Sequence, residues 1–254
     1  MPAHGARQGF VKTPATEALR SILVHRPVTI LALGPLTNVA TFLVNYPELC
    51  RQIVRVIAVA GRRPGQRFQP SPFLPVSLGD SNFEADFSCF DLVLRSGVPM
   101  TLIPYEVAAK VTLNRQDLDD LLTGPPASQW VSEQASGWLQ LWRWGLQTDG
   151  FFPFDTLAVG YVTGSQRFQC DLLSAQVVSR SGIWSSTLTL EVSKHIQNGN
   201  LVTYCYNVSP QFKLDLMQRL RAGVTATSAV KVVAAPANGA TETDTHQRRE
   251  KEKI

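Results

Sequence analysis

The sequence TILALGPLTN, residues 29–38, combines a short apolar run with a sharp stop. Gly34 and Pro35 are strong turn formers, and two small polar residues, Thr37 and Asn38, follow them. A brief apolar run bounded by a turn is typical of a strand buried in a parallel sheet. In open α/β sheets, ligands bind beyond the carboxyl ends of the strands. The stretch therefore predicts an α/β fold and a polar rim directly after its first recognisable strand.

Two more apolar runs followed by turn residues, 53–61 and 99–107, predict further strands that end near Gly61 and Glu106. Helical patterns fill the segments 37–49 and 86–96 between them. Asp86 suits the N-cap of the second helix, and Gly97 suits the left-handed position after its end. Strands that alternate with helices predict an open, mostly parallel sheet with flanking helices.

The second half of the chain carries a long helical pattern and then β patterns. Residues 126–145 predict a helix in which Trp138 and Trp142 lie one turn apart. Two interpretations of these tryptophans stay open, packing in the core and a contact between subunits, where Trp is enriched. The segments 176–195 and 199–208 predict β structure, and 209–220 predicts a short closing helix.

Composition bounds the domain organisation. The chain has 254 residues, and 44% of them are apolar, which is enough for one substantial core. We assign residues 1–223 to a single domain. After about residue 223 the composition shifts to Ala, Thr, Pro and mixed charge, so residues 224–254 are expected to form a disordered charged tail.

Charge and hydropathy argue against several classes of partner. The formal net charge is +4, but the basic residues are scattered, which disfavours nucleic acid. No apolar run is long enough to span a membrane, and the N-terminus lacks the apolar segment of a secretory signal. The four cysteines are widely spaced, and we interpret all of them as reduced thiols. The cysteines are Cys50, Cys89, Cys170 and Cys205. Together these features predict a cytoplasmic protein.

Four segments, in this order and at these spacings, resemble the inosine-uridine-preferring nucleoside hydrolases. They are ILALGPLTNVATFL, IVRVIAVAG, DSNFEADFSCFDLVLRSGVPMTLIPYEV and FFPFDTLAVGYV, and the likeness runs from about residue 18 to 220. The resemblance implies a Rossmann-like α/β fold and hydrolysis of the bond between ribose and a base in ribonucleosides. It also implies a bound Ca²⁺ and a homo-oligomer.

The resemblance assigns roles to four residues of this chain. The backbone carbonyl of Thr37 and the carboxylate of Asp155 would be calcium ligands, although Asp155 also suits the cap of the helix that follows it. Asn82 would bind ribose hydroxyls, with a loop-stabilising role as the alternative. Asp80 would help to bind the sugar.

The family's pattern is not complete in this sequence. The signature D-T-D-x-G-x-D-D is absent, and no Asp precedes Asp80, so the general-base aspartate and most calcium carboxylates are not found. Without the first strand and helix, we expect an uncovered sheet edge and low stability. Phe154 stands where some members carry a histidine that protonates the leaving base. The loop 62–80 is long and rich in proline and is expected to shape the base pocket or to form a lid or a plain surface loop.

Three hypotheses on function remain at the level of sequence. The chain represents an active calcium-dependent hydrolase whose start is missing, a pseudoenzyme that binds a nucleoside or ribose without chemistry, or a subunit completed by another polypeptide. The sequence does not separate purine from pyrimidine substrates.

Overall fold

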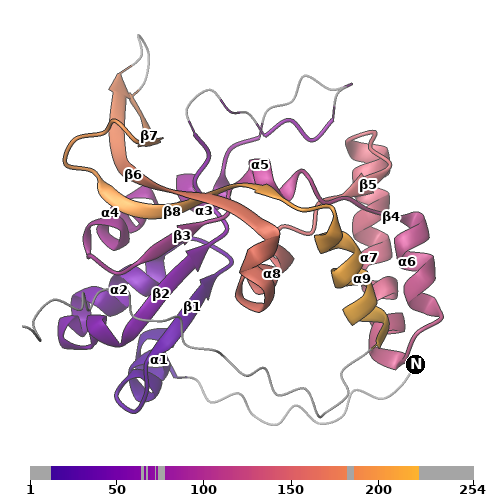
Figure 1. Cartoon of the computed structure of the whole chain (residues 1–254), viewed down its shortest axis with the longest axis horizontal. Coiled ribbons are helices and arrows are strands. Elements are labelled where there is room, and N and C mark those ends of the chain that lie inside the picture. The colour runs from indigo at the N-terminus through magenta and orange to yellow at the C-terminus, as the bar shows by residue number, and fades with distance from the viewer. Residues whose placement is uncertain are drawn as a thin grey trace, which may run out of the picture. The chain divides into compact units, whose positions relative to one another are not determined.

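The structure is a computed structural model, and it describes residues 13–63, 66, 68–71, 73, 78–181 and 186–222 (Figure 1). The chain divides into two compact units, Met1–Val224 and Thr225–Ile254. The second unit lies outside the described residues, as does the tail predicted for residues 224–254. Everything below concerns the first unit.

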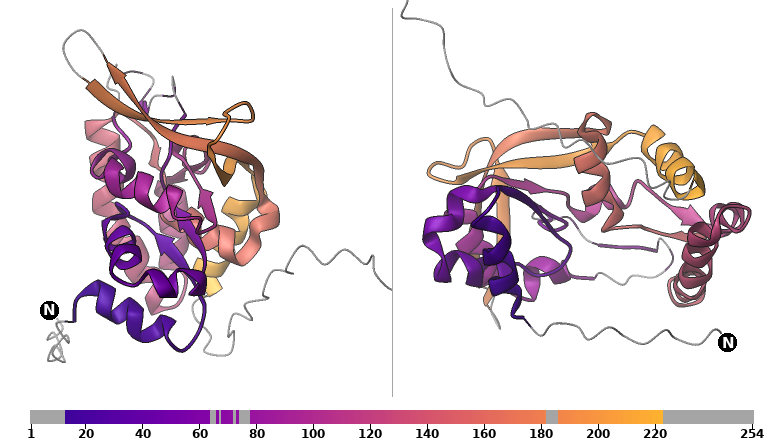
Figure 2. Two further views of the ribbon diagram at one scale, coloured as in Figure 1. Left: turned by 90° about the vertical axis from the view of Figure 1, so that its left-hand side faces the viewer. Right: turned by 90° about the horizontal axis from the view of Figure 1, so that it is seen from below.

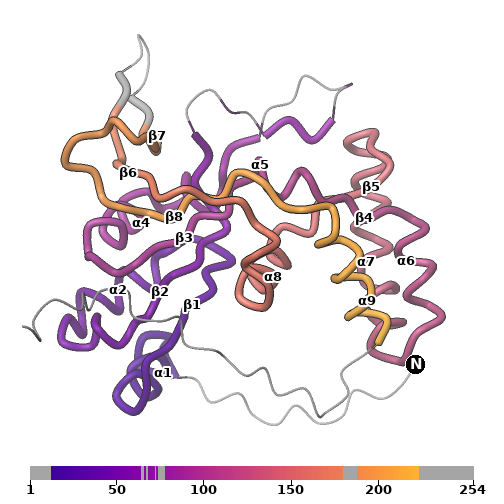
Figure 3. The backbone as a smooth tube through the Cα atoms, in the orientation of Figure 1, coloured from indigo at the N-terminus to yellow at the C-terminus, as the bar shows by residue number. Residues whose placement is uncertain are grey.

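The described elements follow the chain as shown in Figure 3. The helices are α1 (Ala15–Leu23), α2 (Thr37–Asn45), the 3₁₀ helix η1 (Pro47–Gln52), α3 (Ser81–Glu84), α4 (Phe87–Arg95), α5 (Tyr105–Ala108), α6 (Arg115–Leu122), α7 (Pro126–Gly145), α8 (Thr156–Gly164), the 3₁₀ helix η2 (Ser165–Arg167) and α9 (Gln211–Ala222). The strands are β1 (Val28–Ala32), β2 (Ile53–Ala58), β3 (Met100–Leu102), β4 (Leu113–Asn114), β5 (Gly150–Phe151), β6 (Phe168–Ser181), β7 (Ser186–Ser193) and β8 (Asn200–Val208).

Among the described residues, six strands form one mixed sheet in the order β1-β2-β3-β8-β6-β7. The pairs β1–β2, β2–β3 and β3–β8 are parallel, whereas β6 pairs antiparallel with both β8 and β7. The parallel half is built from the three apolar runs of the first half of the sequence and from β8. The predicted α/β class with an open, mostly parallel sheet is therefore confirmed.

Helices cover both faces of this sheet, as Figure 2 shows from two sides. On one face, Leu23 of α1, Phe42 of α2 and Phe90 of α4 join a buried cluster with β2, β3 and β8. On the other face, Leu157 of α8 and Phe212 of α9 pack in a second cluster with the strands. The alternation of side chains along β2 supplies both clusters, since Val56 faces the first and Ile57 the second.

A third cluster joins α6, α7 and β5, with partly buried residues of α9 packed against it. Leu139 and Trp142 are its buried residues on α7, so Trp142 belongs to the core. Trp138 packs edge-on against Trp142 with ring centroids 6.1 Å apart, but about half of its surface is exposed. The core interpretation therefore holds for Trp142 and only partly for Trp138.

Local signals account for several helix ends. The carboxylate of Asp86 accepts a hydrogen bond from the Cys89 amide at 3.1 Å, which confirms the predicted N-cap of α4. Gly97 has φ +78°, as expected for the residue beyond the helix end. The third apolar run is only partly a strand, because β3 ends at Leu102 and the chain turns into α5 after Pro104. Proline is well tolerated at a helix start, so α5 begins there.

Strand β1 lies at one edge of the sheet, where the described residues pair it with β2 alone. Most of its side chains are only half-buried, and Leu33 directly after it is 44% exposed. This arrangement agrees with the uncovered edge expected from the sequence. The expected low stability stays a prediction.

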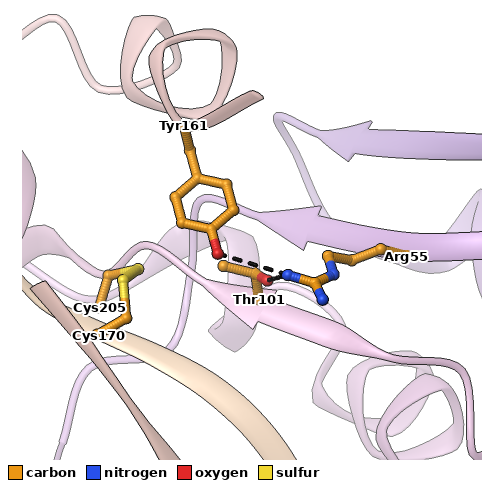
Figure 4. The surroundings of a disulfide bond; sticks show 5 residues. All are labelled: Arg55, Thr101, Tyr161, Cys170 and Cys205. Carbon is orange, nitrogen blue, oxygen red and sulfur yellow. Dashed lines mark hydrogen bonds between the residues drawn. A yellow bond between two sulfur atoms is a disulfide. The ribbon is translucent and has the colours of Figure 1, made fainter. Parts of the chain in front are cut away.

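The interpretation of the cysteines was wrong for two of the four. Cys170 of β6 and Cys205 of β8 form a disulfide, and Figure 4 shows it near Arg55, Thr101 and Tyr161. The two residues are 35 positions apart in sequence, but the antiparallel pairing of β6 with β8 sets them directly opposite each other. Cys50 and Cys89 are free and half-buried.

Within the described part of the chain, no helix is both long and apolar enough to cross a bilayer.

Gly160 tests the packing of α8 on α9. A Cβ at this position would lie 2.1 Å from Cε2 of the buried Phe212 ring. Overpacking of this kind costs about 1–3 kcal/mol, so Gly160→Ala should lower the free energy of unfolding measured by urea denaturation by that amount. Gly137 of α7 is the matched control, because its added Cβ meets open space. Gly137→Ala should instead stabilise the chain by about 0.5–1 kcal/mol, and equal losses in both variants would contradict this packing.

Candidate functional site

A cavity of about 250 Å³ lies where β1 and β2 end, between α3, α5 and the start of α8. It brings together three of the four predicted site residues, Asp80, Asn82 and Asp155. This position, at the carboxyl ends of parallel strands, is the usual ligand site of open α/β sheets. The full lining is Leu33, Val59, Ala60, Arg62, Phe68, Gly79, Asp80, Ser81, Asn82, Tyr105, Phe154 and Asp155.

Asp80 holds the exit of β2 against the start of α3. Its Oδ2 accepts hydrogen bonds from the amides of Gly61 at 2.6 Å and Arg62 at 3.4 Å, and its Oδ1 accepts from Phe83 N at 3.3 Å. The carboxylate is thus the N-cap of α3. Gly61 has φ +99°, a left-handed conformation that glycine adopts without strain, and this turns its amide toward Asp80. Both carboxylate oxygens are engaged by the backbone, so Asp80 positions the site.

Asn82 is fixed by two backbone carbonyls. Its Nδ2 donates to the carbonyl of Val59 at 2.9 Å and, more weakly, to that of Leu33 at 3.5 Å. These contacts use both hydrogens of the amide group and orient the side chain between the ends of β1 and β2. No described residue donates to its Oδ1, which therefore stays available as an acceptor at the cavity.

Asp155 carries the free carboxylate of the cavity. It occupies the N-cap position of α8, but its side chain makes no capping hydrogen bond, and no described residue donates to it. Partial burial raises the pKa of this carboxyl above its usual value. The side chain of Asp155 therefore does not cap α8 by a hydrogen bond. Its oxygens can accept hydrogen bonds from a ligand or bind a cation.

An aromatic wall made of Phe68, Tyr105 and Phe154 forms another side of the cavity. The rings of Phe68 and Tyr105 lie 4.3 Å apart, and Phe68 meets Phe154 edge-on at 5.6 Å. Phe154 is backed by Phe152 and by Trp142 of α7. A planar ring is the kind of group that such a wall would stack.

The loop after β2 contributes to this wall and to a charged border. Phe68 comes from this loop, in agreement with its predicted role in shaping the pocket, whereas eight of its residues lie outside the described ranges. Arg62 lines the cavity and forms an ion pair with Glu84 at 2.6 Å. Glu106, which follows β3, pairs with Arg63 at 2.9 Å and does not line the cavity.

Thr37 is the predicted site residue that the structure does not bring to the cavity. It is the first residue of α2, its carbonyl accepts a hydrogen bond from Thr41 Oγ1 at 2.7 Å, and its hydroxyl donates to Asp86. Leu33 lines the cavity instead, and its carbonyl accepts a weak hydrogen bond from Asn82 at 3.5 Å. Sequence reasoning missed Leu33, although its place at the end of the first strand was a usable signal. The role of Thr37 as a metal ligand stays a prediction, and its position does not favour it.

The residues described do not fit a calcium site. Ca²⁺ takes about six to eight oxygen ligands, usually with several carboxylates. The cavity offers one unengaged carboxylate, Asp155, beside the Leu33 carbonyl and Asn82 Oδ1, because Asp80 is committed to backbone amides. In the described part of the chain, no group of three or more His, Cys, Asp or Glu side chains could hold a metal.

The geometry defines an α/β protein with a cavity at the carboxyl edge of its sheet, and the described residues line it with one carboxylate without a hydrogen-bond donor, one oriented amide and an aromatic wall. The sequence pattern of the inosine-uridine preferring nucleoside hydrolases matches residues 4–253, and the chain belongs to this family. The family hydrolyses N-glycosidic bonds, and the resemblance proposed from the sequence is confirmed.

Individual relatives are distant. The chain is 25% identical over 188 residues to the non-specific ribonucleoside hydrolases RihC of Salmonella typhi and Salmonella newport. The match covers 73% of this chain and 58% of each relative, so the chain spans little more than half of their length.

Solved structures show the same fold. A plant nucleoside hydrolase, PpNRh1, superposes with a TM-score of 0.72 at 18% identity, over 85% of this chain and 69% of that one. A purine-preferring ribonucleoside hydrolase from Gardnerella vaginalis gives 0.70 at 18% identity, over 85% and 67% of the two chains.

The capping role of Asp80 can be separated from general loss of stability. Asp80→Ala and Asp86→Ala each remove an N-cap and should each lower the free energy of unfolding by about 0.5–2 kcal/mol. Amide hydrogen exchange should then distinguish the two variants. The Gly61 amide should lose protection in Asp80→Ala only, because Asp86 does not contact that turn. Unchanged protection of Gly61 in Asp80→Ala would contradict the assigned role.

The pH dependence of stability follows from the same residue. Burial raises the pKa of Asp80 above 3.8, although the amides of Gly61, Phe83 and Arg62 oppose the shift. A carboxyl whose pKa is higher in the folded state binds its proton more tightly in that state. The same carboxyl in the unfolded chain therefore loses its proton at a lower pH. As pH rises from about 3.8 through the folded pKa, Asp80 should therefore reduce the free energy of unfolding. Urea denaturation across this range should show this slope in the wild type and a smaller slope in Asp80→Asn.

Proposed function

We propose that this chain binds the ribose of a ribonucleoside in the cavity at the ends of β1 and β2, and that it serves in hydrolysis of the N-glycosidic bond. The supporting observation is that Asn82 and Asp155 both line one cavity. Asn82 is held by two carbonyls so that Oδ1 is left as an acceptor, and Asp155 has no partner among the described residues. Sugar hydroxyls are donors, and a site built to pair them discriminates against ligands that lack them.

The aromatic wall suits the base of such a ligand. A ribose bound between Asn82 and Asp155 would direct its base toward Phe68, Tyr105 and Phe154, where either a purine or a pyrimidine can stack. This wall contains no histidine, so protonation of the leaving base has no assigned donor among the described lining residues. The relatives named above are described as non-specific and as purine-preferring, and either description is compatible with this wall.

The proposed chemistry of these residues is limited to binding and charge stabilisation. Cleavage of an N-glycosidic bond develops positive charge on the sugar, and an ionised Asp155 near that charge would stabilise it. Asn82 and Asp155 would orient the ribose by accepting hydrogen bonds from its hydroxyls. Calcium stays a proposal with Asp155 as one ligand, and no step is assigned to it because the ligand set is too small.

The shortage of carboxylates in the cavity also favours a second candidate function. With one unengaged carboxylate, the described residues do not supply both a bound cation and a base to activate water. A module that binds nucleosides without hydrolysis, or a subunit that receives further carboxylates from another polypeptide, fits this observation equally well. A cytoplasmic location also stays a proposal, and the Cys170–Cys205 disulfide removes the cysteine argument for it.

Titration calorimetry and a ribose-release assay on the same preparation separate these functions. We expect inosine and uridine to bind, and their 2′-deoxy analogues to bind at least tenfold more weakly. Asn82→Ala should weaken binding by roughly tenfold to a hundredfold, because an oriented acceptor is lost. Asn207→Ala is the matched control, since Asn207 lies on β8 and bonds only to Gln169 among described side chains.

Each result has a distinct meaning. Ribose release that requires calcium would support the hydrolase and would show that ligands beyond the described residues complete the metal site. Binding without ribose release, with and without calcium, would support the binding module. Absence of binding by a chain with a cooperative unfolding transition would overturn the proposal.

A further inference from the structure

Glu106 is a half-buried carboxylate outside the cavity, and it joins α5 to the loop after β2. It is the second residue of α5, and its side chain is 18% exposed. Its Oε2 accepts hydrogen bonds from Nη2 of Arg63 at 2.9 Å and from Nε2 of Gln66. Both donors belong to the loop, and neither of them lines the cavity. We call Arg63, Gln66 and Glu106 the Glu106 cluster.

The cluster fixes Gln66 by its backbone and by its side chain. The Gln66 amide donates to the Arg63 carbonyl at 3.1 Å, and its Oε1 accepts from the Arg63 amide at 2.9 Å. The Gln66 carbonyl accepts a hydrogen bond from Nη1 of Arg62 at 3.1 Å. Since Nε2 donates to Glu106, every polar group of Gln66 is engaged. The place of this residue in the loop is therefore set by three partners.

Two residues of the aromatic wall are close neighbours of this cluster in the sequence. Phe68 follows Gln66 by two residues, and Tyr105 directly precedes Glu106. The rings of Phe68 and Tyr105 lie 4.3 Å apart, and the Tyr105 hydroxyl donates to the carbonyl of Gln69 at 3.4 Å. Glu106 thus joins the segment that carries Phe68 to the helix that carries Tyr105.

We propose that Glu106 is a positioning residue for the base of the ligand, which acts through Phe68 by holding the loop so that Phe68 and Tyr105 form one wall. This inference rests on the proposed function, because it requires a base that stacks on this wall. Asn82, which would bind the ribose, is held by backbone carbonyls outside the cluster. Glu106 should therefore contribute to affinity for the base and not to affinity for the sugar.

The charges of the cluster suit this role. Hydrogen bonds to an ionised carboxylate are roughly twice as strong as those between neutral groups. The hydrogen bond with Glu106 raises the pKa of Arg63 above its usual value, so Arg63 stays a cation beside the carboxylate. The guanidinium of Arg63 also lies over the ring of the buried Tyr204 of β8, 5.3 Å from its centroid. Arg63 therefore connects the loop to β8 as well as to α5.

Amide hydrogen exchange without ligand tests whether Glu106 holds Phe68. The Leu78 amide donates to the carbonyl of Phe68 at 2.8 Å, so its protection reports on the position of Phe68. In Glu106→Gln this amide should exchange at least tenfold faster. Asp91→Asn is the matched control, because Asp91 of α4 also pairs with an arginine, at 2.8 Å, and also has one buried oxygen without a partner among the described residues. It should leave the protection of Leu78 unchanged.

Titration calorimetry tests the effect on the base. Inosine carries a base and a sugar, whereas methyl β-D-ribofuranoside, measured by competition with inosine, carries the sugar alone. Glu106→Gln should weaken inosine binding by roughly threefold to tenfold, which is the order of one aromatic contact, and leave riboside binding unchanged. In a Phe68→Ala background, Glu106→Gln should cause no further loss, because a residue that acts through Phe68 has no effect once that ring is removed. Circular dichroism and thermal unfolding should show that each variant is folded.

The outcomes separate this role from the proposed function. A merely structural role would lower stability without separating the two ligands. Unchanged Leu78 protection in Glu106→Gln, equal losses for inosine and the riboside, or the same loss of inosine binding in the Phe68→Ala background would overturn the positioning role alone. If the wild type bound neither ligand, the proposed function would be overturned, and this role would be overturned with it.

Discussion

The site depends on one partly buried carboxylate, that of Asp80. By accepting hydrogen bonds from Gly61, Arg62 and Phe83, it ties the turn after β2 to the first turn of α3. Asn82 lies in that turn of the helix, and its amide donates to the carbonyls of Val59 and Leu33. The ends of two parallel strands and a short helix are thereby held as one unit. Desolvation of Asp80 is the cost of this arrangement, and it appears as a raised pKa.

The same arrangement explains why the cavity has so little negative charge to offer a cation. A carboxylate that caps a helix and binds a turn is not free to bind a metal ion, and Asp155 is the acidic side chain of the lining that remains. Adding further carboxylates near Asp155 without a cation would raise their mutual repulsion and shift their pKa values upward. The protonation of Asp155 would therefore be coupled to the binding of any cation beside it.

The aromatic residues connect the cavity to the far side of the third cluster. Phe154 lines the cavity and contacts Trp142, which in turn packs against Trp138 on the border of the exposed face of α7. Close-packed aromatic rings transmit displacement because they leave little free volume.

The sequence alone determined the α/β class, the parallel strands β1 and β2, the bounds of α7 and the caps of α4, because apolar periodicity, turn residues and capping residues act over a few neighbouring positions. It also singled out Asp80, Asn82 and Asp155 as residues of one site. Tertiary structure decided their contacts: the backbone amides that engage Asp80, the absence of a capping bond at Asp155, and the place of Leu33 rather than Thr37 at the cavity. It also decided the pairing of Cys170 with Cys205. These features depend on contacts between segments distant in sequence, and local patterns carry no record of which segments meet.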